Sequence, residues 1–196
     1  MYTINTEYFN NINTEEQAYV LAWFLSRGSG HVQVSKRDLD VLFLIKNAIK
    51  YTGEIHHYTR SELNITNKDF RRNLLAAGCV KNNHCIPHFP IIPPELNRHF
   101  IRGIYDSYGT IRLCKGKYIN VSITYDEECV STIRKHLLTM DISTKHYYRY
   151  THTNTVQMMI TRTGDAKKFL DWIYQDANYY LTRKFIEYQE MLKKSV

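Results

Sequence analysis

The chain has 196 residues, of which 43% are apolar, and its 26 Lys and Arg against 19 Asp and Glu give a formal net charge of +7. That length and apolar content allow one sizeable core or two small ones, which excludes disorder as the default expectation. No apolar run reaches membrane-spanning length, the N-terminus lacks the order of a signal peptide, and the four cysteines have no repeated CxxC spacing. We therefore expect a reduced, cytoplasmic protein, associated with the nucleoid in a bacterial or phage-infected host.

In the first half, the pattern predicts a helix that begins at Thr14, has Gln17 three residues later as in a capping box, and stops at Gly28. Polar and apolar residues then alternate over 31–35, as in a half-buried strand. The next helix has a predicted core stripe at helical spacing, made of Leu39, Leu42, Phe43, Ile45 and Ile49. The half ends with a predicted hairpin and a short helix, over 55–60, 63–66 and 69–77.

All four prolines fall in one short segment, as Pro87, Pro90, Pro93 and Pro94. Proline fixes φ and removes a backbone donor, so this segment predicts an extended connection. It divides the chain into a first repeat over 1–85, a proline-rich linker over 86–94 and a second repeat with C-terminal helices over 95–196.

The second half repeats the order of the first and adds a tail. A predicted helix over 95–107 precedes two alternating strands, 110–114 and 119–124, which flank the turn Lys115-Gly116-Lys117. The helix predicted over 126–140 carries one apolar face, made of Val130, Ile133, Leu137 and Leu138. A second hairpin and two tail helices follow, over 145–152, 155–161, 165–174 and 179–194.

Each half has a helix that ends in the same pattern of small residues. The pattern places two small residues four positions apart on one helical face, Ala22 with Ser26 and Gly103 with Ser107. Such a face lets two helix backbones approach closely. Each helix then ends at a glycine followed by a hydroxyl residue, Gly28 in the first half and Gly109 in the second.

This doubled pattern resembles the LAGLIDADG homing endonuclease family, in its single-chain, two-repeat form, over roughly residues 15–194. The resemblance implies an α+β fold of two pseudo-symmetric αββαββα repeats with a C-terminal helical extension. In that family the motif helices pack together at a pseudo-twofold axis, and two four-stranded antiparallel sheets form a saddle over the DNA major groove.

The family cuts DNA with an acid one residue before each motif glycine, and the pair holds divalent metal at the scissile phosphates. Here those positions carry Arg27 and Tyr108, neither of which can replace a carboxylate. The resemblance therefore implies a degenerate, catalytically inactive member with no metal and no cofactor. Arg27 could instead contact a phosphate where the metal would lie. Asp106 is expected to be structural, and rescue of cleavage by Asp106 or by another acid such as Asp38 is disfavoured.

In such a saddle, the polar members of the alternating strands face the DNA. The candidates are Arg27, His31, Gln33, Ser35, Lys36, His57, Thr59 and Arg60 in the first half, and Arg112, Lys115, Lys117, Asn120, Ser122, Lys145, Tyr147, Arg149 and Gln157 in the second. The turn lysines are expected at phosphates, and Gln33, Arg112 and Arg149 at base edges. A solvated sheet face would show the same alternation.

Two other kinds of site are disfavoured. His56-His57 and the loop with Cys79, His84, Cys85 and His88 do not have the spacing of a zinc finger or ribbon. No Gly-x-Ser-x-Gly elbow of a serine hydrolase is present.

The basic charge and the 16 tyrosines, many beside basic residues, suit a nucleic-acid partner. The leading hypothesis is a monomeric, sequence-specific double-stranded DNA-binding protein without membrane contact, acting as a transcriptional regulator of a phage or mobile element. Two alternatives stay open. One is an active LAGLIDADG endonuclease that cuts duplex DNA with Mg²⁺, and the other is an RNA-binding, maturase-like splicing factor.

Overall fold

The computed structural model describes residues 2–25, 30–78, 89–144, 146–149 and 155–194, with the backbone alone in 146–149. The first half contains α1 (Glu15–Leu25), β1 (His31–Val34), the 3-10 helix η1 (Lys36–Asp38), α2 (Leu39–Ala48), β2 (His56–His57), β3 (Ser61–Asn64) and α3 (Lys68–Ala76). The second contains η2 (Pro94–Leu96), α4 (Asn97–Tyr108), β4 (Gly109–Cys114), β5 (Tyr118–Asp126), α5 (Glu127–Thr139), β6 (His146–Arg149), β7 (Thr155–Ile160), α6 (Thr163–Tyr174) and α7 (Thr182–Lys194).

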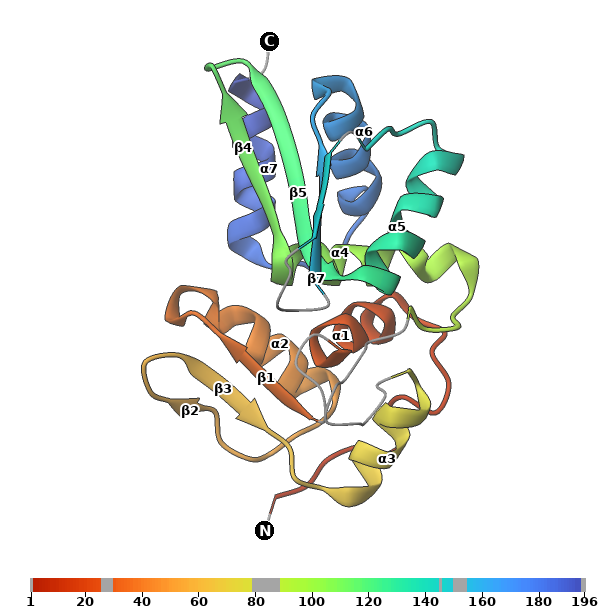
Figure 1. Ribbon diagram of the computed structural model, residues 1–196. Helices are drawn as coiled ribbons and strands as arrows, with labels where there is room; N and C mark the ends of the chain where they lie inside the picture. Colours follow the sequence, from red (N-terminus) through yellow and green to blue (C-terminus); the bar gives the residue numbers. More distant parts are fainter. Residues whose placement is uncertain (1, 26–29, 79–88, 145, 150–154, 195–196) are drawn as a thin grey trace.

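The motif helices α1 and α4 lie side by side at the centre, with one sheet on each side of them (Figure 1). The strand order is β1-β3-β2 in the first sheet and β4-β5-β7-β6 in the second, and every pairing is antiparallel. Helices α5 and α6 cover one face of the second sheet, and α7 runs along β4 (Figure 1). The expected α+β fold with two repeats and a helical extension is therefore confirmed.

The first repeat differs in one respect from the expected αββαββα order, which the second repeat follows. The described residues between α1 and α2 form one strand, so the first sheet has three strands in the described part of the chain, where four were expected. After β1 the chain turns at once into η1, where the Asp38 amide donates to the Ser35 carbonyl at 2.9 Å. The connection from β1 to α2 is therefore too short to contain the second strand of a hairpin.

Side-chain caps set the starts of three helices. At α1 the Gln17 amide donates to Thr14 Oγ1 at 3.2 Å, which is the predicted N-cap contact. The Gln17 side chain accepts from the amide of Asn13 at 3.0 Å, one residue before the N-cap, so the second bond of the capping box is shifted by one residue. Asn67 caps α3 by accepting from the Phe70 amide, and Asp126 caps α5 by accepting from the Glu128 amide. No helix in the described part of the chain is both long and apolar enough to span a bilayer.

The first three residues of the predicted proline linker, 86–88, fall outside the described residues. The described part, from Phe89 to Pro93, has no regular secondary structure and leads into η2. The residue boundaries of the two repeats and the linker, at 85 and 94, stay a prediction. Cys114 and Cys129 are free thiols, whereas the loop over 79–88, with the disfavoured zinc ligands, is outside the described part.

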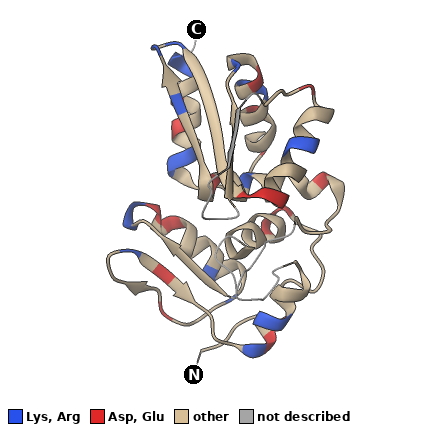
Figure 2. Ribbon diagram, in the orientation of Figure 1, with Lys and Arg blue, Asp and Glu red and all other residues tan. Residues whose placement is uncertain are grey.

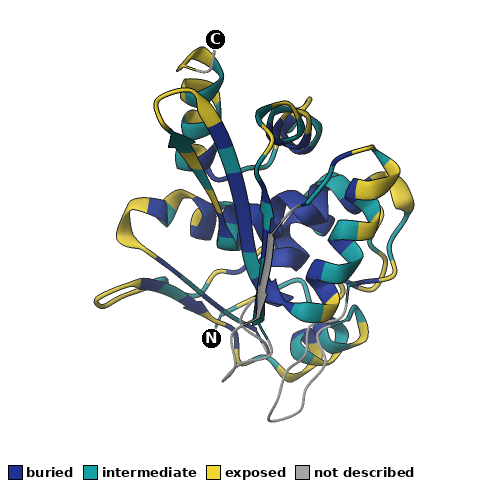
Figure 3. Cartoon of the chain, turned by 45° about the horizontal axis from the view of Figure 1, so that its top comes forward, coloured by how far each residue is buried: buried dark blue, intermediate teal, exposed yellow. Residues whose placement is uncertain are grey.

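Lys and Arg are spread over both halves with acidic residues among them (Figure 2). The buried residues are concentrated in the helices at the centre of the molecule and along the long strand of the second sheet (Figure 3). Every residue of α1 from Ala18 to Leu25 is buried, as is every residue of α4 from His99 to Asp106. The two helices are therefore the centre of the core.

Two predicted core residues are exposed. Phe43 is 49% exposed and Leu138 is 72% exposed, whereas their neighbours Leu42 and Leu137 are fully buried. Adjacent residues on a helix are rotated by about 100° from each other. The core-facing stripes of α2 and α5 are thus narrower than predicted, and the predictions for Phe43 and Leu138 are wrong.

The motif helices approach so closely that α4 has no room for a side chain at Gly103. A Cβ atom there would lie 2.6 Å from the Ala22 Cβ and 2.7 Å from the Tyr19 carbonyl oxygen. Backbone atoms of a central helix cannot yield at low cost, because the interior is close-packed. The spacing of the two halves is therefore set by this backbone contact.

A buried carboxylate joins both motif helices to the C-terminal segment. Asp106 on α4 accepts from the Tyr19 hydroxyl at 2.8 Å, the Tyr174 hydroxyl at 2.6 Å and the Leu181 amide at 2.8 Å. Burial raises the pKa of Asp106 to about 6, although these three hydrogen bonds and the charge of Arg102 act in the opposite direction. Asp106 is thus structural, as expected.

One turn earlier on α4, the fully buried Arg102 makes a second set of contacts. Its guanidinium donates to the carbonyls of Ile173 and Tyr179 and to Glu15 Oε1, each at 2.7 Å. A buried guanidinium needs such partners because its desolvation is costly. Arg102 and Asp106 together attach the chain between α6 and α7 to the motif helices.

We predict that Gly103→Ala lowers the free energy of unfolding by about 1–3 kcal/mol through overpacking. Alanine also stabilises the interior of a helix by about 1 kcal/mol relative to glycine, and this gain offsets part of the overpacking loss. Urea denaturation measures the net change in the free energy of unfolding. The control is Gly164→Ala on α6, where an added Cβ meets nothing within 4 Å. If Gly103→Ala is as stable as Gly164→Ala, the backbone contact does not set the helix spacing.

We predict that wild type loses stability relative to Asp106→Asn as pH rises. The pKa of Asp106 is about 6 in the folded protein, against an ordinary value of 3.8, so the native state binds more protons between these values. The stability that protonated Asp106 contributes is therefore complete below the lower value and lost as pH rises through the higher one. Denaturation at several pH values from 4 to 7 tests this. A stability difference that stays constant, or moves the other way, contradicts it. The exposed Asp176→Asn controls for the loss of one carboxylate.

Candidate nucleic-acid interface

The first sheet has a polar face built from alternate residues of β1 and β3. His31 and Gln33 alternate with the buried Val32 and Val34 along β1. The antiparallel register pairs His31 with Asn64 and Gln33 with Glu62. Directly paired residues lie on the same face of a sheet, so β3 contributes Glu62 and Asn64 to this polar face.

The predicted candidate His57 lies in a different row of the first sheet. It pairs with Ser61, which is buried and pairs with Val34, and its Nδ1 lies 3.0 Å from Ser61 Oγ. The placement of His57 on the polar face is therefore wrong. Its neighbour His56 pairs with Glu62 and completes the row His56–Glu62–Gln33 across the three strands.

In the second sheet the predicted polar residues of β4 and β5 do lie together. Arg112 pairs with Asn120, and Thr110 pairs with Ser122, whose hydroxyl lies 2.8 Å from the Thr110 hydroxyl. On β7, Gln157 Nε2 donates to Thr124 Oγ1 at 3.2 Å. Lys115 and Lys117 are exposed in the β4–β5 turn, and the Lys117 ammonium lies 4.9 Å from the ring centre of Tyr118.

The register of β6 separates two further candidates from this face. Tyr147 pairs with Met158 and Arg149 with Val156, and both partners are buried core residues. Gln157, on the polar face, pairs instead with Tyr148. The predicted grouping of Tyr147 and Arg149 with Gln157 is therefore wrong in register. The side chains of β6, and the candidates Arg27 and Lys145, lie outside the described residues, as do Ser26 and Gly28 of the first motif.

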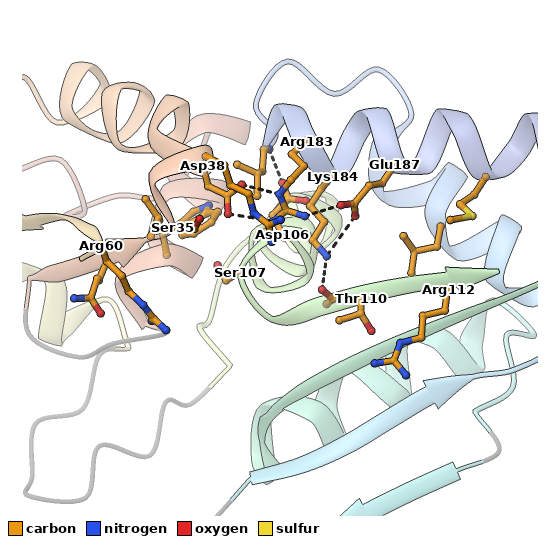
Figure 4. Close-up of a pocket in the computed structure, with 18 residues that line it drawn as sticks. Ser35, Asp38, Arg60, Asp106, Ser107, Thr110, Arg112, Arg183, Lys184 and Glu187 are labelled. Carbon is orange, nitrogen blue, oxygen red and sulfur yellow. Dashed lines mark hydrogen bonds and ion pairs between the residues drawn. The ribbon is translucent and has the colours of Figure 1, made fainter. Parts of the chain in front are cut away.

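A cleft of about 660 Å³ lies between the two halves at the C-terminal end of α4 (Figure 4). The first half contributes Gln33, Ser35 and Arg60, and the second contributes Ser107, Thr110 and Arg112. Arg60 and Arg112 point into the cleft from opposite sides (Figure 4). Within the described part of the chain neither guanidinium has an ion-pair partner. The candidate Ser35 is exposed, as are Lys36 and Thr59, which are sequence neighbours of the cleft residues Ser35 and Arg60.

The wall of the cleft formed by α7 was not predicted. Arg183 donates from Nε to Asp38 Oδ1 at 2.7 Å and from a second nitrogen to Asp38 Oδ2 at 3.2 Å, and it also pairs with Glu187 at 2.7 Å. Lys184 is buried and donates to the Gly109 carbonyl. Burial lowers the pKa of Lys184, although Glu187 acts in the opposite direction. These contacts hold α7 against both halves.

The acids near the motif ends are engaged elsewhere. Tyr108, where the family resemblance predicts an acid, ends α4, and its ring packs on Tyr125 at a centroid distance of 4.9 Å. Asp38 is paired with Arg183, and Asp106 is 2% exposed with three donors around it. The described residues contain no group of three His, Cys, Asp or Glu side chains placed to hold a metal ion.

Sequence reasoning missed Glu62 and His56 on the first sheet. The predicted strand began at residue 63, two residues after the observed start of β3 at Ser61. The signal available in the sequence was the alternation of polar Glu62 and Asn64 with apolar Leu63 and Ile65, which places Glu62 in the same strand as Leu63.

Comparison with known proteins identifies the fold. No family model matches the sequence, and no curated protein matches it. Among solved structures, full-length DUF199/WhiA from Thermatoga maritima is 18% identical with a TM-score of 0.56, and the match covers 98% of this chain and 65% of that protein. The chain thus spans less than two thirds of that protein.

Two shorter structures match over most of their length. The N-terminal LAGLIDADG domain of DUF199/WhiA is 18% identical with a TM-score of 0.55, and the match covers 87% of this chain and 89% of that domain. Meganuclease I-SmaMI, bound to uncleaveable DNA, is 12% identical with a TM-score of 0.59, covering 92% of this chain and 90% of that one. The chain therefore has the two-repeat LAGLIDADG fold that its motif helices predicted.

Proposed function

We propose that this chain binds duplex DNA sequence-specifically through the polar faces of its two sheets and does not cut it. The observation that carries the proposal is the pair of polar sheet faces flanking a cleft into which Arg60 and Arg112 point from opposite sides. The DNA major groove is wide enough to admit a two-stranded β-ribbon, and arginine is the commonest side chain that recognises guanine there. The DNA-bound meganuclease with the same fold supports this choice of partner.

Loss of cleavage is proposed from the side chains at the motif ends. Arg27 and Tyr108 stand where carboxylates would hold the metal, and an arginine repels a divalent cation. The three acids that line the cleft are already bound, Asp38 and Glu187 by Arg183 and Asp106 by three internal donors. A protein that binds a specific site without cutting it can regulate transcription through affinity and position alone. We propose that role, in a phage or another mobile element.

Selection of duplexes from a random pool, followed by incubation with Mg²⁺ or Mn²⁺, tests the proposal. We expect enrichment of a defined site that stays intact. Cleavage at a defined position would establish the endonuclease alternative. Tight binding to structured RNA, with only weak and sequence-indifferent binding to duplexes, would establish the maturase-like alternative.

We predict that Lys117→Ala weakens binding to all duplexes by a similar factor and reduces the slope of log K against log salt by about 1, as expected for one lost phosphate contact. Lys117 is exposed in the β4–β5 turn at the end of the polar face. Fluorescence anisotropy over a range of salt concentrations measures both quantities. The control is Lys135→Ala on α5, an exposed lysine on a helix that packs on the opposite face of the sheet. Equal salt slopes for the two variants would refute the contact.

A further inference from the structure

The polar face of the first sheet has a carboxylate at its centre. Glu62 lies on β3, the middle strand, in the row His56–Glu62–Gln33. Its side chain is 20% exposed, so most of it is covered by neighbours. A central acid contrasts with the second sheet, where the corresponding face carries Arg112 and ends in two turn lysines.

Glu62 is held in place through one of its two oxygens. Oε2 accepts from Gln33 Nε2 at 3.3 Å and lies 3.2 Å from His31 Nε2. Oε1 has no hydrogen-bond partner among the described residues. The carboxylate is therefore oriented by β1 and keeps acceptor capacity for a group from outside the chain.

The negative charge of Glu62 limits which DNA groups can bind at the centre of this face. A carboxylate repels phosphate, so Glu62 would reduce the affinity for DNA if it lay against the sugar-phosphate backbone. In the major groove a glutamate has a favourable partner, the N4 amino group of cytosine, which donates a hydrogen bond. A metal is not favoured here, because Glu62 and its histidine neighbours form no three-ligand group within the described chain.

We propose that Glu62, oriented by Gln33 and His31, accepts a hydrogen bond from a cytosine amino group and so selects cytosine at one position of the target. This inference rests on the proposed function, since it assigns one specificity contact to the same DNA-binding face. Gln33 then acts as a positioning residue as well as a candidate for base contact.

The test is duplex selection from a random pool with wild type, Glu62→Gln, Glu62→Ala and the control Glu95→Gln, an exposed glutamate on η2. Wild type and Glu95→Gln should enrich the same site, with cytosine at one position. Glu62→Ala should lose that preference, by about 5- to 100-fold for a contact of this kind. Glu62→Gln should shift the same position toward adenine, because glutamine matches the adenine N6 and N7 groups. Preferences at the other positions should stay unchanged.

Two results overturn the proposal and differ from each other. If both Glu62 variants bind every duplex more tightly by the same factor and keep the wild-type base preferences, Glu62 is only a repulsive charge. DNA binding would then stand, and cytosine recognition would fail. If wild type enriches no duplex, the proposed function itself fails. Thermal melting of each variant confirms that the comparison is between folded proteins.

Discussion

The backbone contact between α1 and α4 is the constraint on which the rest of the structure depends. Gly103 leaves no space for a Cβ atom against Ala22 and the Tyr19 carbonyl, so the helix axes are held at one close distance. The strand β4 begins directly where α4 ends, and β1 follows α1 after a short connection. The helix pair therefore sets where the two sheet edges lie, and with them the cleft that separates the polar faces.

Close contact alone would allow one helix to rotate against the other, and the buried polar groups remove that freedom. Asp106 and Arg102 bind partners on α1, at the end of α6 and in the segment before α7. Burying charged groups is costly, so we infer that this network contributes more to a unique arrangement than to net stability. It also makes the C-terminal segment part of the scaffold, because α7 then places Arg183 against Asp38.

The helix pair and the order of elements could be predicted from the sequence because their signals are local: a cap at Thr14, small residues four apart, and a glycine at each helix end. The buried network could not, because its partners lie 68 to 87 residues apart along the chain. Strand faces were the weakest point. A shift of one residue exchanges the two faces of a strand, which is why His57 was assigned to the polar face. Glu62 was missed because the predicted strand began one residue after it.

Chemical-shift mapping by NMR with the selected duplex tests most directly whether the two sheet faces form the DNA interface. The account predicts the largest changes at amides of β1, β3, β4, β5 and β7, in both halves of the chain, with small changes on α3 and α5. Changes confined to the outer helices, or to one half alone, would contradict it.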